Sequence, residues 1–424
     1  MANSLFKNFL SLAGAETFTK LITFAAFAYL ARLFGASGFG YIEWAGAVLM
    51  CASLIVDQGF SAYGAREIAK NPGQTANFVA EIVTARFAFA AAAYLTVLIF
   101  AFLFVEQAIL RQLLLLYGLS LWILPFLLQW VFQGHDRMHT VAIAQIVRQT
   151  IFVTVIFIFV RNADDLLIIG AAEVVAVFCA AAFTLWMCRR NFPPHIKFRP
   201  MLSVKLLREG MPIGFSQMFW VIKMFGATFI VGLVATADDT GHFAGAMRIY
   251  IALHTFVWLY FANLLPSFSR ARKEGSEKFA GLIKNSLRTV LPLGFIGALV
   301  WFFAAPFVIK AAFGQDFAAG AGALQWLAGA CYAAAISGHY RFGLIAAGFQ
   351  TKEMWASASG AAAAIVLIPV FYLNAGTSGA GAALCVAEFF ILFVVWLISK
   401  RKLFSADSLQ VKENNFKNLS EATR

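Results

Sequence analysis

Long hydrophobic stretches separated by short polar segments limit what this chain can fold into more than any other feature of its sequence. Twelve stretches reach the roughly 20 residues that a membrane-spanning helix needs, and they cover residues 10–34, 38–63, 78–104, 112–133, 141–160, 165–188, 209–236, 242–267, 286–312, 321–347, 356–373 and 379–399. Helices satisfy their own backbone polar groups, which a bilayer cannot do for them. The sequence therefore predicts an all-α polytopic membrane protein with twelve transmembrane helices.

The composition agrees with a membrane protein. Of the residues, 61% are hydrophobic and only 13% are charged, whereas about 25% are charged in ordinary soluble domains. In a soluble protein, the net charge of +12 would suggest a nucleic-acid partner, but in a membrane protein basic residues gather on cytoplasmic loops. We therefore predict no nucleic-acid partner. The five cysteines lie inside hydrophobic stretches without metal-ligand spacing, so we predict neither a metal nor a cofactor.

The distribution of Lys and Arg predicts the orientation of the chain. With the N-terminus in the cytoplasm, 23 of the 33 basic residues fall on the cytoplasmic side and four on the outer side. Cytoplasmic loops carry the excess of Lys and Arg in membrane proteins. We therefore expect a multi-pass protein of the inner (plasma) membrane with both termini in the cytoplasm.

A long basic segment divides the predicted helices into two groups of six. We predict an N-terminal six-helix bundle at 1–188, a cytoplasmic linker at 189–208, a C-terminal six-helix bundle at 209–399 and a cytoplasmic tail at 400–424. Both bundles begin alike, because a glycine at the start of the second helix, Gly40 or Gly241, is soon followed by Ala-Gly-Ala. Two parallel repeats of this kind are a common transporter plan.

The segment Leu30–Lys70 holds the end of one hydrophobic helix, a predicted glycine-rich turn at Gly35–Gly40 and a second helix. Its Leu-Ala-Arg before the turn, its Asp57-Gln58-Gly59 and its Ala65–Ala69 resemble the Wzx-type polysaccharide and O-antigen flippases of the multidrug/oligosaccharidyl-lipid/polysaccharide exporter superfamily. Phe132-Gln133-Gly134 and Arg341–Gln350 resemble the same family.

This resemblance implies a MATE-like fold and a non-enzymatic function. The family moves undecaprenyl-diphosphate-linked oligosaccharide from the cytoplasmic to the periplasmic leaflet by alternating access. The implied partners are this lipid-linked oligosaccharide, membrane lipids and the polysaccharide polymerase machinery.

Charged residues inside the hydrophobic stretches are the candidates for function, because a charge in a bilayer is costly. Cations bind a diphosphate through charge-assisted hydrogen bonds. We predict that six basic residues bind substrate, namely Lys20, Arg86, Arg148, Lys223, Arg248 and Arg341. Three acidic residues are the predicted ion-coupling groups, namely Asp57, Glu173 and Glu388.

Several of these residues also have a structural interpretation. Glu16 and Lys20 are four residues apart on one helix and would neutralise each other. Lys20 and Lys223 lie at similar depths in the first helix of each bundle, where they would face a shared cavity from opposite walls. Glu173 and Glu388 are either partners of the cations or groups that bind protons.

Three alternatives to a polysaccharide flippase remain open. A drug or cation antiporter of the same superfamily would use a site centred on carboxylates. A lipid II flippase is disfavoured because that group typically carries two further spans. A membrane-embedded glycan polymerase or glycosyltransferase is disfavoured because every outer loop is short.

The segment Gly134–His139 contains two histidines and one aspartate. Its short loop lacks the helical framing of a zinc motif, so we predict a solvated turn there and no metal site.

Overall fold

The computed structural model describes residues 2–192 and 204–403, although some side chains within α1 and α8 are not described. Most of the predicted linker 189–208 and of the predicted tail 400–424 therefore lies outside the described residues. The chain separates into two compact units. Unit 1 contains Met1–Ala244 and Ala312–Asp316, and unit 2 contains Gly245–Ala311 and Phe317–Arg424.

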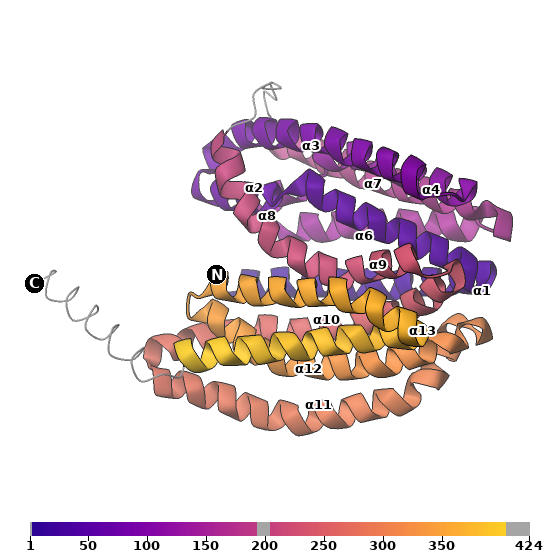
Figure 1. The fold of residues 1–424 in the computed structure, drawn as a ribbon. Helices are drawn as coiled ribbons and strands as arrows, with labels where there is room; N and C mark the ends of the chain where they lie inside the picture. The colour runs from indigo at the N-terminus through magenta and orange to yellow at the C-terminus, as the bar shows by residue number, and fades with distance from the viewer. Residues whose placement is uncertain (1, 193–203, 404–424) are drawn as a thin grey trace, which may run out of the picture. The chain divides into compact units, whose positions relative to one another are not determined.

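Unit 1 is a group of helices joined by short 3-10 turns (Figure 1). Its elements are α1 (Ala2–Asp57), α2 (Phe60–Lys70), η1 (Pro72–Gln74), α3 (Thr75–Phe104), α4 (Ala108–Leu119), η2 (Ser120–Trp122), η3 (Leu124–Phe126), α5 (Gln129–Gly134), α6 (Met138–Phe159), η4 (Ala163–Asp165), α7 (Leu166–Asn191), α8 (Val204–Met224), α9 (Gly226–Val234) and the start of α10 (Ala237–Glu274). Helix α1 packs against α6 and α3, and α7 packs against α6 and α4.

Unit 2 contains the rest of α10, most of α11 (Ser276–Phe313), η5 (Gln315–Gly320), α12 (Ala321–Ala346) and α13 (Gln350–Lys402), with η5 divided between the two units. Its most extensive packing is between α12 and α13. Phe268 and Phe279, which are fully buried, close the junction of α10 and α11 with an edge-to-face contact of 6.0 Å between ring centroids.

Two very long helices, α1 and α13, each fold back at a glycine. In α1, only Gly35 leaves the helical conformation, with φ 64° and ψ −173°. In α13, the break lies at Ala375 and Gly376, where Gly376 has φ 58°. Positive φ is strained for other residues and natural for glycine. The predicted turn at Gly35–Gly40 was too long, since Ala36 to Gly40 already belong to the second arm of α1.

The backbones of α1 and α10 cross each other in a reciprocal contact within unit 1. A Cβ atom on Gly40 would overlap the carbonyl oxygen of Ala237, and one on Gly241 would overlap the carbonyl oxygen of Ala36. Each glycine lies four residues after the alanine of its own helix, which is the spacing of small residues that lets membrane helices approach closely. Gly40 and Gly241 are at equivalent positions of the two predicted repeats. Each of them therefore packs against the helix that carries the other.

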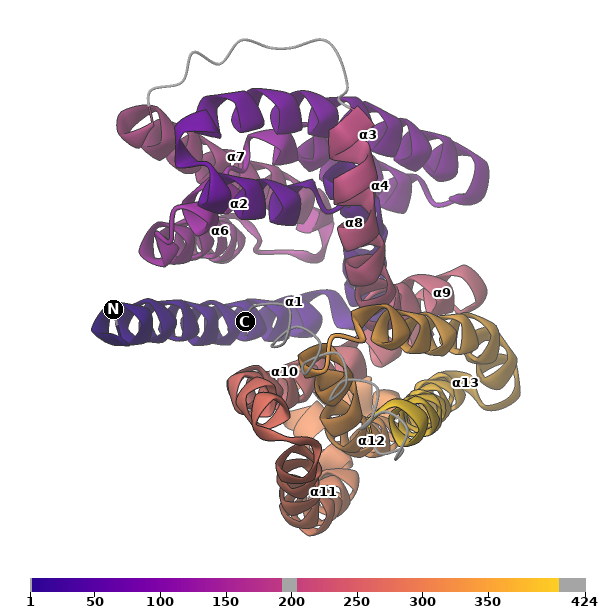
Figure 2. The same cartoon turned by 90° about the vertical axis from the view of Figure 1, so that its left-hand side faces the viewer.

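Helices α8 and α9 pack against other helices of unit 1. Figure 2 shows α8 running past α2, which it contacts. A Cβ atom on Gly59 would overlap the backbone of Gly214, and Gly59 itself has φ 78° directly after the end of α1. Further along, the indole nitrogen of Trp44 donates a hydrogen bond of 2.9 Å to the carbonyl of Phe229.

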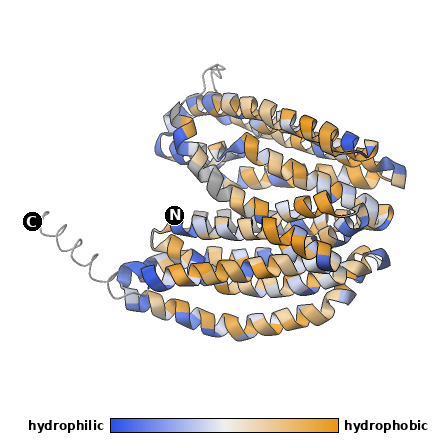
Figure 3. Ribbon diagram, in the orientation of Figure 1, coloured by the Kyte–Doolittle hydropathy of each residue, from blue (hydrophilic) through white to orange (hydrophobic). Residues whose placement is uncertain are grey.

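Among the described residues, nine helices are long and hydrophobic enough to cross a membrane. The twelve predicted stretches map onto these helices and onto α8–α9, because α1 and α13 each contain two of them. Figure 3 shows hydrophobic residues along the middle of the helices and hydrophilic residues near their ends. The exact number of crossings remains a prediction.

Candidate functional site

Arg86 lies in α3 and is one of the most deeply buried cations of unit 1. Its side chain is 6% exposed, and its Nε atom lies 3.4 Å from Oδ1 of Asp57, at the end of α1. This contact is an ion pair without a hydrogen bond from Nε. Its Nη1 donates to the carbonyl of Leu127 at 3.4 Å, and Ser61 donates to the same Asp57 oxygen at 2.5 Å. Arg86 thus connects two places where helices are interrupted.

The second of these interruptions lies between α4 and α5, around Pro125. Two 3-10 turns replace the α-helix there, and Leu127 has extended backbone. Thr184 of α7 accepts a hydrogen bond of 3.2 Å from the Leu128 amide and donates to the Phe126 carbonyl at 3.4 Å. The Thr184 side chain therefore forms hydrogen bonds with backbone groups that have no helical partner at this break. A helix break inside a membrane requires such substitute partners.

Arg148 of α6 and Glu173 of α7 form a second ion pair between candidate residues of unit 1. Nη2 of Arg148 lies 2.5 Å from Oε1 of Glu173, and the two side chains are 41% and 14% exposed. Because Arg148 is more exposed than Arg86, it would lose less buried surface if it turned away from its carboxylate partner. The structure thus brings together one predicted substrate-binding residue and one predicted ion-coupling residue.

In unit 2, Arg341 is held in a three-residue network at the end of α12. Its Nε donates to Oε1 of Glu353 at 2.8 Å, and its Nη2 donates to the Ser357 hydroxyl at 2.9 Å. Ser357 in turn donates to the same Glu353 oxygen at 2.8 Å. Glu353 was not singled out from the sequence, because it belongs to the helix after the one that carries Arg341.

Glu388 of α13 lies in the interior of unit 2 and is 1% exposed. The hydroxyl of Tyr250 donates to its Oε1 at 3.3 Å. The ring of His254, one turn along α10, lies 5.7 Å from the Tyr250 ring. Arg248 is in the same helix and half-buried. This buried carboxylate therefore has a tyrosine and a histidine in its neighbourhood.

The two predicted lysines occupy different environments. Lys223 is 5% exposed and lies in the last turn of α8, next to the break at Phe225 that separates α8 from α9. Lys20 in α1 is exposed. The side chain of Glu16 lies outside the described residues, so its pairing with Lys20 remains a prediction.

The turn around His135 is packed onto the end of α7. The His135 ring stacks on Phe192 with centroids 4.0 Å apart, and its Nε2 lies 2.9 Å from the Thr75 hydroxyl oxygen. Partial burial, assisted by the charge of Arg137, lowers the pKa of His135. Within the described residues, no three His, Cys, Asp or Glu side chains form a group that could hold a metal.

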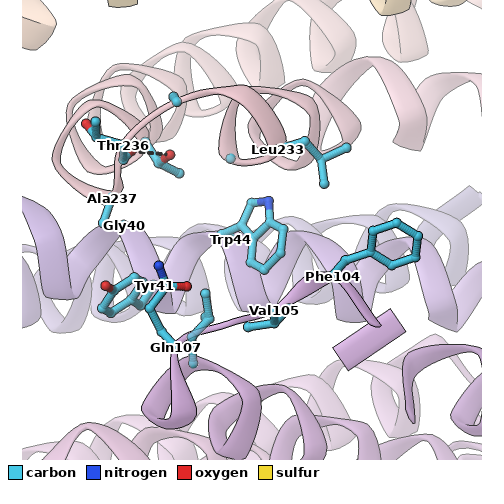
Figure 4. A pocket seen from close by; sticks show the side chains of 13 residues that line it. Gly40, Tyr41, Trp44, Phe104, Val105, Gln107, Leu233, Thr236 and Ala237 are labelled. Atoms are coloured by element: carbon cyan, nitrogen blue, oxygen red, sulfur yellow. Dashed lines mark hydrogen bonds between the residues drawn. The ribbon is translucent and has the colours of Figure 1, made fainter. Parts of the chain in front are cut away.

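Sequence reasoning missed a pocket near the reciprocal crossing of α1 and α10. We call it the Trp44 pocket, and its 13 lining residues are Gly40, Tyr41, Trp44, Phe104, Val105, Gln107, Leu110, Gly232, Leu233, Ala235, Thr236, Ala237 and Thr240. Figure 4 shows Tyr41 and Gln107 close together at one end, with Trp44 nearer to Phe104 and Leu233 at the other. Its residues come from connections far apart in the chain, and no spacing in the sequence marks them.

The geometry gives the chain paired charges within its helices and a separate neutral pocket. This arrangement suits binding and transport of an amphipathic molecule, because charged, polar and hydrophobic parts would each find matching groups. The chain is thus a multi-pass membrane protein with helices interrupted beside charged residues, as in transporters.

Solved structures with a similar fold are transporters. A multidrug resistance MATE family transporter of the MOP superfamily, in an inward-facing conformation, is similar with a TM-score of 0.73 and 15% identity, over 91% of this chain and 94% of that one. The lipid II flippase MurJ, in an inward closed conformation, is similar with a TM-score of 0.76 and 13% identity, over 92% and 87%. These likenesses confirm the predicted all-α, MATE-like fold.

The family described as "Polysaccharide biosynthesis protein" matches residues 5–272. The chain belongs to this family, which confirms the predicted resemblance. The Escherichia coli (strain K12) protein named "Putative O-antigen transporter" is 22% identical over 328 residues, which are 74% of this chain and 77% of that protein.

Proposed function

We propose that this protein is a flippase that moves an undecaprenyl-diphosphate-linked oligosaccharide across the bacterial inner membrane for surface polysaccharide synthesis. The family match over residues 5–272 carries this proposal. The O-antigen transporter name of the Escherichia coli relative supports the same substrate class. Similarity to the fold of a lipid II flippase fits a substrate that keeps its lipid tail in the membrane.

In this proposal, the polar head of the substrate passes through the protein while the lipid tail stays in the bilayer. The six predicted cations, Lys20, Arg86, Arg148, Lys223, Arg248 and Arg341, would offset the diphosphate charge. Arg148 is the best placed of the paired arginines to exchange its carboxylate for a phosphate, because its side chain is 41% exposed. Proton uptake by Glu173 would release Arg148 for this purpose, and Asp57 and Glu388 are the other proposed ion-coupling groups.

The proposed topology has two six-helix bundles, at 1–188 and 209–399, separated by the long basic linker at 189–208. The excess of Lys and Arg on one side would place this linker, the tail at 400–424 and both termini in the cytoplasm. The polysaccharide polymerase machinery would receive the substrate on the outer side. The chain itself would act as a transporter and form no covalent bond.

Deletion of the gene tests the function. We expect lipid-linked oligosaccharide to accumulate and surface polysaccharide to disappear, with both restored by the intact gene on a plasmid. Normal surface polysaccharide together with greater uptake of cationic dyes would instead identify a drug antiporter, a function that similar MATE structures make a reasonable second candidate. Loss of polymer length without accumulation of the precursor would identify a polymerase.

A further inference from the structure

We propose that the Trp44 pocket binds one neutral sugar ring of the transported oligosaccharide. This inference rests on the proposed function and assigns a part of the substrate to a particular place. The cavity of about 180 Å³ lies below the ~300–1,000 Å³ of pockets that enclose drug-sized ligands. It therefore has room for a single ring rather than for a chain of sugars.

The pocket exists because two connections without helical structure border it. Helix α3 ends at Phe104, and Val105 and Gln107 that follow it are extended. Helix α9 ends at Val234, and Ala235 is extended before α10 begins. Both connections fall at the ends of the predicted hydrophobic stretches, where water and a polar ligand can reach them.

Hydrogen-bonding groups at one end of the pocket are available to a ligand. Among the described residues, neither the Tyr41 hydroxyl nor the Gln107 side-chain amide has a protein partner. The Thr236 hydroxyl accepts a hydrogen bond of 3.2 Å from the Asp239 amide and retains its own proton to donate. A hydroxyl donates one hydrogen bond and accepts two, and an amide side chain does both. Together they match the mixed donors and acceptors of sugar hydroxyls.

The other part of the pocket offers aromatic surface. Phe104 lines it and is 69% exposed. Trp44 behind it is 5% exposed and is held by its hydrogen bond to Phe229 and by ring contacts with Phe100 and Phe229, at 5.8 Å and 6.1 Å between centroids. The face of an aromatic ring carries negative charge density. The slightly positive C–H groups on one face of a sugar ring are attracted to such a surface.

The neutral lining of the pocket favours a sugar ring over the diphosphate and the lipid tail of the substrate. None of the 13 described lining residues is charged, so a diphosphate would find no cation there. A lipid chain would exclude water from Tyr41 and Gln107 and leave their polar groups without partners, which is unfavourable. A neutral ring with hydroxyls at its edge satisfies both ends of the pocket.

The test uses the full-length protein in bilayers of phosphatidylethanolamine and phosphatidylglycerol, free of sugar-containing detergent. The probe is the oligosaccharide released by mild acid from the lipid-linked oligosaccharides of the source cells, and its contact with the protein is measured by saturation-transfer NMR. We expect signals from the ring C–H protons. Gln107→Leu combined with Tyr41→Phe should weaken binding about thirtyfold, since each removes a hydrogen bond worth about 1 kcal/mol and about 1.4 kcal/mol is a factor of ten.

Gln112→Leu is the matched control, because Gln112 is exposed on α4 and does not line the pocket. It should bind like the wild type. Trp44→Ala is avoided because Trp44 packs against Gly232 and Phe229 and its loss would disturb the fold.

Equal binding by the wild type and the double variant would overturn the proposal. Displacement of the oligosaccharide by farnesol would assign the pocket to lipid, and displacement by inorganic diphosphate would assign it to the phosphates. If the wild-type gene and the double variant restore surface polysaccharide equally well in a deletion strain, the sugar-binding role of the pocket is refuted while the flippase function stands. If the wild-type gene itself changes no polysaccharide, the proposed function fails.

Discussion

The N-terminal half of α3 and its C-terminal end differ sharply in their chemistry. In the N-terminal half, Arg86 is buried and held by Asp57 and by the Leu127 carbonyl. At the C-terminal end, Phe104 and residues that follow it line the neutral Trp44 pocket. The two regions are 18 residues apart on one helix, which is about 27 Å at 1.5 Å per residue.

The comparison shows that the buried cation and the neutral pocket lie beside different parts of α3. The Arg86 side chain is engaged by protein groups, whereas Tyr41 and Gln107 in the pocket have polar groups without protein partners among the described residues. A residue that is costly to bury is therefore used here to hold helix ends together. The predictions below test whether the two regions behave as differently as their contacts indicate.

The largest effect is expected at Arg86. Arg86→Met removes the cation and leaves Asp57 and the Leu127 carbonyl without it, and breaking a buried ion pair typically costs about 3–5 kcal/mol. We expect a large fall in the amount of folded protein and in the Tm of the purified protein. The double variant Arg86→Met with Asp57→Leu removes both charges and should recover part of the loss.

A similar Tm for Arg86→Met and the wild type would mean that the pair contributes little to stability. In that case, loss of transport in the same variant would support the proposed role of Arg86 in binding substrate.

A smaller effect is expected at the glycine crossing beside the Trp44 pocket. Gly241→Ala places a Cβ atom against the carbonyl oxygen of Ala36, and overpacking of this kind costs about 1–3 kcal/mol. Gly40→Ala should behave alike, because its Cβ would meet the carbonyl of Ala237 in the same way. Thermal unfolding of the purified variants measures both.

Gly46→Ala is the matched control in the same arm of α1. No atom lies within 4 Å of a Cβ built there, so alanine should stabilise the helix by up to about 1 kcal/mol. Destabilisation at all three glycines alike would show that the crossing is not special.

Trp44→Phe should have an effect of about 1 kcal/mol. It retains an aromatic ring but removes the hydrogen bond to the Phe229 carbonyl, and a typical net hydrogen bond is worth about that much. We expect a slightly lower Tm and weaker contact of the sugar probe. Unchanged values for both would mean that the fixed orientation of the indole does not matter.

The smallest effect concerns the exposed charges around Glu67 in α2. A hydrogen bond from Lys70, and another from Arg66, lower the pKa of the Glu67 carboxylate. Because the folded pKa is lowered, the stabilisation is present above the ordinary glutamate pKa of about 4.3 and is lost as the pH falls through the lowered value. Lys70 and Arg66 are 57% and 45% exposed, so the gain is below about 1 kcal/mol.

Glu67→Gln should therefore lower the Tm slightly at neutral pH, and this difference should shrink as the pH falls through the lowered pKa of Glu67. Glu277→Gln, at an exposed glutamate of α11, is the control and should change little over the same pH range. A Tm difference for Glu67→Gln that persists at low pH would point to packing rather than charge.

The sequence predicted the fold class well because twelve hydrophobic stretches leave few alternatives to membrane helices. It also placed a turn near Gly35 but made it too long, since composition alone cannot show that Ala36 to Gly40 are helical and packed against α10. The spacing of Ala36 and Gly40, repeated at Ala237 and Gly241, was a signal that could have revealed this crossing.

The contacts of the candidate residues could not be predicted from spacing along the chain. Arg148 and Glu173 are paired across two helices, and helix-surface rules apply only to residues three or four positions apart. The Trp44 pocket was missed for a related reason, because its polar groups come from helix ends and connections rather than from charged residues inside the helices.

The most direct test of the account is transport by the purified protein in liposomes that contain the lipid-linked oligosaccharide in both leaflets. A glycosidase added outside, which cannot cross the membrane, cleaves only the molecules in the outer leaflet. We expect the protein to make the inner-leaflet molecules accessible as well, and a liposome without protein to keep them protected. Protection that persists in the presence of folded, inserted protein would contradict the proposed flippase function.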